Sequence, residues 1–69
     1  MQFRDAQQYV GYTCEVAYKD RHGDVLRETM HIVDVSYVPM YGLCMLTDVR
    51  EVRLDRIVEV QAIDMAQAA

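Results

Sequence analysis

Residues 50–60 decide the fold, and they read Arg50-Glu51-Val52-Arg53-Leu54-Asp55-Arg56-Ile57-Val58-Glu59-Val60. Val52 and Leu54 alternate with charged neighbours, which is the period of a half-buried strand. The alternation then breaks, and a single 3₁₀ turn would place Leu54 and Ile57 on one side because they are three residues apart. After that turn, the inward positions are predicted to be Val58, Val60 and Ala62. A strand, one tight turn and a second strand predict the segment that closes a small five-stranded barrel.

Residues 25–38 form the longest extended run, and their apolar side chains change parity partway along. The even positions carry Leu26, Met30 and Ile32, whereas the odd positions carry Val33, Val35 and Tyr37. Because a regular strand cannot change faces without an inserted residue, we predict a bulge or sharp bend near Ile32 and Val33. A long strand bent in this way lets a small sheet curl over itself.

The other extended runs are shorter. Residues 12–19 alternate, with Cys14, Val16 and Tyr18 on one face. The polar loop 20–24 contains a glycine and connects this run to 25–38 as a hairpin, and the Pro-Met-Tyr-Gly turn at 39–42 leads into the next run. The predicted strands are 12–19, 25–38, 43–47, 50–54 and 57–62.

The two ends of the chain differ from this pattern. Residues 5–10 predict one or two helical turns, with Asp5 as the N-cap, Ala6, Tyr9 and Val10 on one side, and Gly11 as the stop. We expect the tail at residues 64–69 to fray, since its apolar content is weak. The sequence therefore predicts one mainly all-β domain over residues 1–69, a small bent five-stranded SH3/Sm-like barrel with a short N-terminal helix.

The charge balance is acidic. Seven Lys and Arg face eleven Asp and Glu, which gives a net charge of -4. The chain therefore has no overall cationic field that would attract nucleic acid or anionic lipid. No apolar run approaches the roughly 20 residues that a membrane helix needs, and the N-terminus lacks the pattern of a signal peptide. We expect a cytoplasmic protein with no membrane association.

The nucleophiles and metal-ligand types form no recognisable catalytic motif. Cys14 and Cys44 lie in predicted strands, and we expect two reduced, buried thiols, with a disulfide as the alternative. The single serine, Ser36, and the histidines have no supporting signature for acyl transfer. The one compact polar group, Asp20, His22 and Asp24, is explained by turn chemistry. We expect no enzyme activity, no cofactor and no metal.

Three arginines, Arg50, Arg53 and Arg56, fall within seven residues. Guanidinium groups so spaced suit a phosphate or carboxylate ligand. The alternative is a set of mutual salt bridges with the neighbouring acids Glu51, Asp55 and Glu59. Both interpretations remain open at the level of the sequence.

Two segments together resemble a WYL domain, a bacterial regulatory family. They are Val16-Ala17-Tyr18-Lys19-Asp20-Arg21-His22-Gly23-Asp24 and Val49-Arg50-Glu51-Val52-Arg53-Leu54-Asp55-Arg56-Ile57. The resemblance implies an SH3/Sm-like barrel that senses a ligand or nucleic acid. It also implies that the ligand-binding residues are Tyr18, Arg50, Arg53 and Arg56.

The second of these segments also resembles, more weakly, the end of the Rho-binding antiterminator. That protein is acidic and Sm-like, and it occupies the RNA-binding surface of its target. Two functions are therefore expected. The first is a non-enzymatic regulatory binding module that senses an anionic ligand or nucleic acid. The alternative is an acidic protein-interaction module that inhibits a nucleic-acid-binding partner by covering its basic surface. A third interpretation is a homo-oligomer joined through exposed sheet edges.

Overall fold

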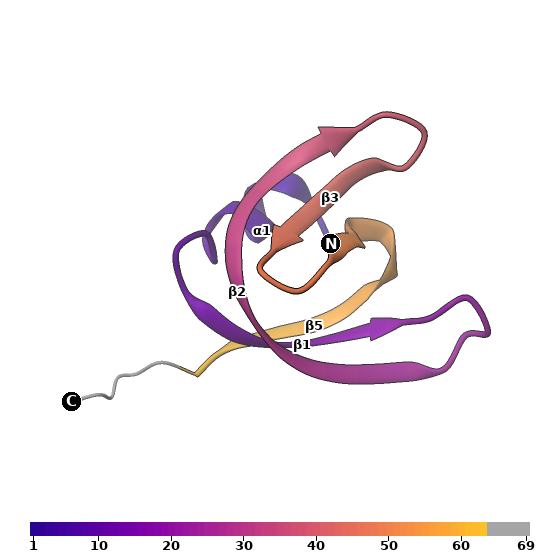
Figure 1. Cartoon of the computed structure of the whole chain (residues 1–69), viewed down its shortest axis with the longest axis horizontal. Helices are drawn as coiled ribbons and strands as arrows, with labels where there is room; N and C mark the ends of the chain where they lie inside the picture. The colour runs from indigo at the N-terminus through magenta and orange to yellow at the C-terminus, as the bar shows by residue number, and fades with distance from the viewer. Residues whose placement is uncertain (64–69) are drawn as a thin grey trace.

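The computed structural model describes residues 1–63, whose strands form one antiparallel sheet that curls over itself (Figure 1). The elements are α1 (Phe3–Gln7), β1 (Thr13–Lys19), β2 (Val25–Val38), β3 (Gly42–Thr47), β4 (Glu51–Arg53), the 3₁₀ turn η1 (Leu54–Arg56) and β5 (Ile57–Ala62). The strand order is β4-β3-β2-β1-β5, with β4 and β5 at the two edges. The predicted fold class, a small, bent, mainly β barrel with one short helix, is confirmed. The predicted tail at residues 64–69 lies outside the described residues.

The long strand β2 bends where the parity of its side chains changes, as predicted. Its first half pairs with β1 and its second half pairs with β3. Opposite β3, Ile32 pairs with Thr47 while Asp34 pairs with Leu46, so Val33 is the extra residue of a bulge. The bulge lets both Ile32 and Val35 be buried, although they lie three residues apart. This bend carries one strand from the β1 side of the sheet to the β3 side (Figure 1).

The closing segment contains the predicted 3₁₀ turn between β4 and β5. Leu54 is buried in the core, and Ile57 packs against it. The prediction for β5 was wrong at two positions, because Val58 and Ala62 are exposed and only Val60 packs inward. Ala17 pairs with Glu59 and Tyr18 pairs with Ile57, so Val58 is an extra residue and the register shifts there. A second bulge therefore moves the inward face of β5 from Val58 to Ile57.

The N-terminal helix begins and ends earlier than predicted, since it stops at Gln7 and not at Val10 before Gly11. Helix α1 spans Phe3–Gln7, its N-cap is Gln2, and no side chain caps it. The prediction of Asp5 as the cap was wrong, because Asp5 lies inside the first turn and the Ala6 amide already donates to the Gln2 carbonyl. The predicted inward side is correct, since Ala6 is buried and Tyr9 and Val10 pack against the core.

The two cysteines are both buried, but they lie on opposite faces of the sheet. Cys14 belongs to the core cluster together with Met45. Cys44 precedes Met45 in β3, and neighbouring strand residues point to opposite faces. The predicted burial of both thiols is correct, and this placement holds them apart.

Candidate functional site

Glu28 links two of the four residues that the sequence predicted as ligand contacts. The Tyr18 hydroxyl donates to Glu28 Oε1 at 2.9 Å. Arg50 approaches the same carboxylate with two nitrogens, Nε at 3.1 Å from Oε1 and Nη2 at 3.2 Å from Oε2. A bidentate guanidinium–carboxylate pair is the stronger form of this contact. Sequence reasoning missed Glu28, because it pairs with an arginine 22 residues away rather than with a neighbour.

Arg50 is held in place by the turn between β3 and β4. The Thr47 hydroxyl accepts from the amides of Val49 and Arg50 at 3.1 and 2.9 Å, and it donates to the Arg50 carbonyl at 2.7 Å. Asp48 fastens the turn to β2, since its Oδ1 accepts from the His31 amide at 2.9 Å. The turn therefore presents Arg50 to Glu28 from a fixed backbone.

The hydroxyl of Tyr18 stays protonated near neutral pH. Burial raises the pKa of Tyr18, and its hydrogen bond to Glu28 raises this pKa further, while the nearby charge of Arg50 opposes the shift. The direction is expected, because both burial and a neighbouring carboxylate disfavour a phenolate. Tyr18 is therefore a hydrogen-bond donor at this position and not a base.

The other two predicted contacts lie apart from this network. Arg53 pairs with Asp55 at 3.0 Å, the one local salt bridge that forms among those the sequence offered as an alternative. Its Nε atom is buried and has no hydrogen-bond partner within residues 1–63. Arg56 donates through Nη1 to the Asp20 carbonyl at 3.0 Å and so ties η1 to the β1–β2 loop. Each arginine thus already has a partner.

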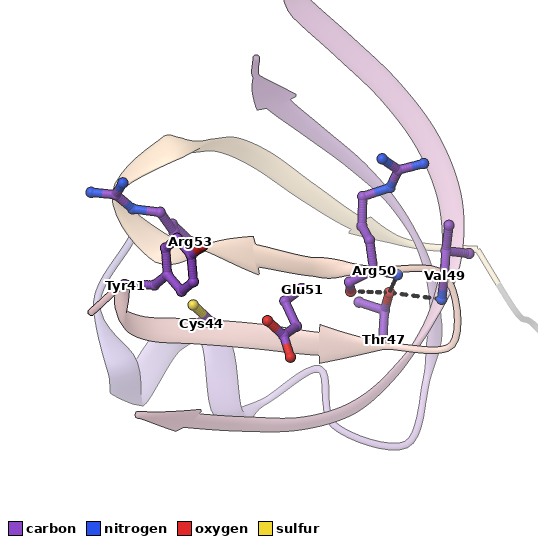
Figure 2. A pocket seen from close by; sticks show the side chains of 7 residues that line it. All are labelled: Tyr41, Cys44, Thr47, Val49, Arg50, Glu51 and Arg53. Atoms are coloured by element: carbon purple, nitrogen blue, oxygen red, sulfur yellow. Dashed lines mark hydrogen bonds between the residues drawn. The ribbon is translucent and has the colours of Figure 1, made fainter. Parts of the chain in front are cut away.

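A hollow near the predicted residues opens beside β4. Its volume is about 570 Å³, and its lining residues are Tyr41, Cys44, Thr47, Val49, Arg50, Glu51 and Arg53. Figure 2 shows Tyr41 and Arg53 at one end and Arg50 at the other, with Glu51 between them. The guanidinium groups extend away from the middle in this view. We call this space the Glu51 hollow.

Glu51 is the lining carboxylate that has no partner. It is exposed, and within residues 1–63 it makes neither a salt bridge nor a side-chain hydrogen bond. Beneath it, burial raises the pKa of the Cys44 thiol, and the charge of Glu51 raises this pKa further. The thiol is therefore kept in its neutral, poorly nucleophilic form. The hollow offers an unpaired negative charge rather than a reactive cysteine.

The end of the β2–β3 hairpin exposes a group of large apolar side chains, which we call the tip surface. The exposed fractions are 66% for Tyr37, 96% for Met40, 58% for Tyr41 and 41% for Leu43. Tyr37 and Leu43 are paired across the two strands and so share one face. The sequence carried a signal for this surface, because the turn at 39–42 contains Met and Tyr where polar turn residues are usual.

A second, smaller hollow also has Tyr41 in its lining. Its volume is about 330 Å³, and its lining residues are Met1, Tyr41, Gly42, Leu43, Leu54 and Asp55. The amino group of Met1 donates to the Leu54 carbonyl at 3.1 Å, which holds the start of the chain against η1. We call this space the Leu54 hollow.

The polar side chain of Asp20 stabilises the turn of the loop 20–24. Asp20 Oδ1 accepts from the amides of His22 and Asp24 at 2.8 and 3.0 Å. This is the turn chemistry that the sequence indicated. Across residues 1–63, no group of three or more His, Cys, Asp or Glu side chains is arranged to hold a metal ion.

Comparison with protein-family models gives no match, and comparisons with curated proteins and with solved structures give none either. No helix in the described part of the chain is both long and apolar enough to cross a membrane. The family resemblances therefore stay expectations, and the functional argument rests on the surfaces described above.

Proposed function

We propose that this chain is a non-enzymatic regulatory binding module of the WYL-like barrel type whose ligand is a protein with a basic surface. The tip surface carries the proposal, because Tyr37, Met40, Tyr41 and Leu43 expose apolar area side by side on a very small domain. Grouped exposed apolar side chains mark interaction sites more often than scattered ones do. Tyrosine and methionine are also enriched in protein interfaces.

The charge of the chain supports a basic partner. The net charge is -4, so the chain repels phosphate backbones and attracts basic protein surfaces at long range. The arginines of the closing segment are already counted in this net charge, and Arg50 and Arg53 are each paired with a carboxylate, that of Glu28 and that of Asp55. Association with a basic partner would be faster at low ionic strength, where the attraction is less screened.

A module of this kind regulates by occupying a surface, and no chemical step is required of it. If the partner uses its basic surface to bind nucleic acid, the two ligands compete for that surface. This mode agrees with the weaker of the two resemblances, to the Rho-binding antiterminator. It also requires neither a cofactor nor a metal.

A direct comparison of two ligand classes tests the proposal. The full chain is titrated with a short basic peptide and, separately, with a single-stranded oligonucleotide, each labelled for fluorescence anisotropy, at low and at physiological salt. We expect binding of the peptide that weakens as salt rises, and no binding of the oligonucleotide. Binding of the oligonucleotide alone would refute the proposal.

One observation favours a second function, the binding of an anionic ligand or nucleic acid near Arg53. Its buried Nε lacks a hydrogen-bond partner among the described residues, and Tyr41 offers an aromatic face at the same end of the Glu51 hollow (Figure 2). Bases stack on such faces while arginines contact phosphates. In this case Arg53→Ala would abolish oligonucleotide binding, whereas Arg53→Lys would retain part of it because the charge remains.

A further inference from the structure

Tyr41 is shared by the two hollows, since it lines both of them. It is also part of the tip surface, next to Met40, the most exposed large apolar residue of those described. Met40 has a φ of +77°, which L residues other than glycine seldom adopt. The turn therefore projects Met40 outward at the cost of local backbone strain. Tyr41 is thus common to the tip surface and to both hollows.

The Glu51 hollow has the groups that recognise a basic side chain. Its two guanidinium groups are engaged, that of Arg50 with Glu28 and that of Arg53 with Asp55, and both extend away from Glu51 (Figure 2). Glu51 thus supplies the one unpaired charge on the lining, and it is negative. A carboxylate beside an aromatic face binds Lys or Arg through a charge-assisted hydrogen bond and a cation–π contact.

The Leu54 hollow is suited to an apolar side chain. Met1, Leu43 and Leu54 contribute to its lining, and Gly42 adds no side chain of its own. The carboxylate of Asp55 is already paired with Arg53, so it does not demand a cation from outside. A volume of about 330 Å³ exceeds what one aliphatic side chain fills.

We infer that the surface around Tyr41 binds a basic and apolar segment of a partner protein. A Lys or Arg of that segment lies between Tyr41 and Glu51, and an aliphatic side chain enters the Leu54 hollow. Charge complementarity selects this occupant, because Glu51 is the only charged side chain on the two linings that lacks an ion-pair partner within the described residues, while the ammonium group of Met1 donates to the Leu54 carbonyl. This inference rests on the proposed function and adds the site and the composition of the segment.

Three synthetic peptides test the composition. Lysine alternates with leucine in the first and with serine in the second, and glutamate alternates with leucine in the third. Titration calorimetry with the full chain should give the tightest binding for the lysine–leucine peptide, weaker binding for lysine–serine and none for glutamate–leucine. Equal binding of the two lysine peptides would overturn the role of the Leu54 hollow.

Matched variants test the site. Glu51→Gln and Asp24→Asn each remove one exposed carboxylate, but Asp24 lies in the loop before β2, away from both hollow linings. We expect Glu51→Gln to weaken the lysine–leucine peptide roughly two- to fivefold and Asp24→Asn to leave its affinity unchanged. Tyr41→Ala, which removes the shared wall, should weaken it roughly tenfold. Circular dichroism of each variant verifies the fold.

The outcomes separate this inference from the proposed function. If Glu51→Gln and Asp24→Asn weaken the peptide equally, only net charge matters, and the site is wrong while the function stands. If no basic peptide binds the wild-type chain, both fail. If light scattering finds a dimer that Met40→Ser dissociates, the occupant is a second copy of this chain, and the inference is overturned.

Discussion

The Tyr18 hydroxyl donates a hydrogen bond of 2.9 Å to Glu28, and the same carboxylate holds Arg50. Tyr18 lies in β1, Glu28 in β2, and Arg50 in the turn before β4. The network therefore ties β1 and β2 through side chains to the turn that leads into the edge strand β4. Its location explains why Arg50 is not available as a cation for a ligand.

Removal of the Tyr18 hydroxyl should destabilise the fold. Tyr18→Phe keeps the buried ring and deletes the donor, so we expect a loss of about 1 kcal/mol in the free energy of unfolding. Urea unfolding followed by circular dichroism measures this loss. Tyr41→Phe is the matched control, because the Tyr41 hydroxyl makes no hydrogen bond within residues 1–63. Equal stability of wild type and Tyr18→Phe would show that the hydrogen bond adds nothing.

The stability of the wild type should fall at high pH more steeply than that of Tyr18→Phe. The pKa of Tyr18 is higher in the folded chain than its ordinary value, first because of burial and then because of Glu28. Its stabilising effect is therefore fully present below about pH 10 and is lost as pH rises through the folded pKa. Unfolding curves taken between about pH 9 and about pH 11 should show the free energies of unfolding of the two proteins converging as the pH rises. A constant difference across that range would contradict the assigned shift.

Deletion of Val33 should prevent folding, although its side chain is exposed. Without the extra residue, the part of β2 after the bulge is shifted by one position, and its inward side chains turn outward. Val33→Ala keeps the residue count, and we expect it to change stability by less than about 0.5 kcal/mol. Near-ultraviolet circular dichroism and thermal melting distinguish the two variants. A cooperative melt of the deletion variant near the wild-type temperature would refute the bulge.

The bend at Val33 could be predicted because apolar residues mark both faces of β2 on either side of it. The bulge at Val58 could not, since Val58 and Val60 preserve an apparent alternation and the shift depends on pairing with β1. The start of helix α1 could not be predicted from a capping residue either. Its first hydrogen bond runs from the Ala6 amide to the Gln2 carbonyl and requires no capping side chain. Local patterns thus identify a bulge only when the pattern itself breaks.

The candidate site was less predictable than the fold. The sequence offered Glu51, Asp55 and Glu59 as partners for the arginines, yet only Asp55 forms such a pair with them. Glu59 pairs instead with Arg27 across β1, at 3.6 Å, and Glu28 pairs with Arg50. Partners so distant along the chain become neighbours through strand order alone. The sequence contained the residues but not their pairing.

Truncation of the Leu54 side chain in η1 should destabilise the fold more than truncation of the Val58 side chain in β5. Leu54 is 3% exposed and Val58 is 53% exposed, so Leu54→Ala leaves a cavity whereas Val58→Ala does not. We expect a loss of about 2–4 kcal/mol for Leu54→Ala and less than about 0.5 kcal/mol for Val58→Ala. Chemical denaturation of both variants measures the difference. Similar losses at the two positions would contradict the register of β5.

The binding of a basic partner at the Tyr41 surface is tested most directly by nuclear magnetic resonance. Amide shifts of the isotope-labelled full chain are followed as the lysine–leucine peptide is added. We expect the shifts to concentrate at five residues and to leave the β1–β2 loop unaffected; the five are Tyr37, Met40, Tyr41, Leu43 and Glu51. Shifts spread evenly over all exposed acids, or shifts at Arg53 and Arg56 produced by an oligonucleotide and not by the peptide, would contradict it.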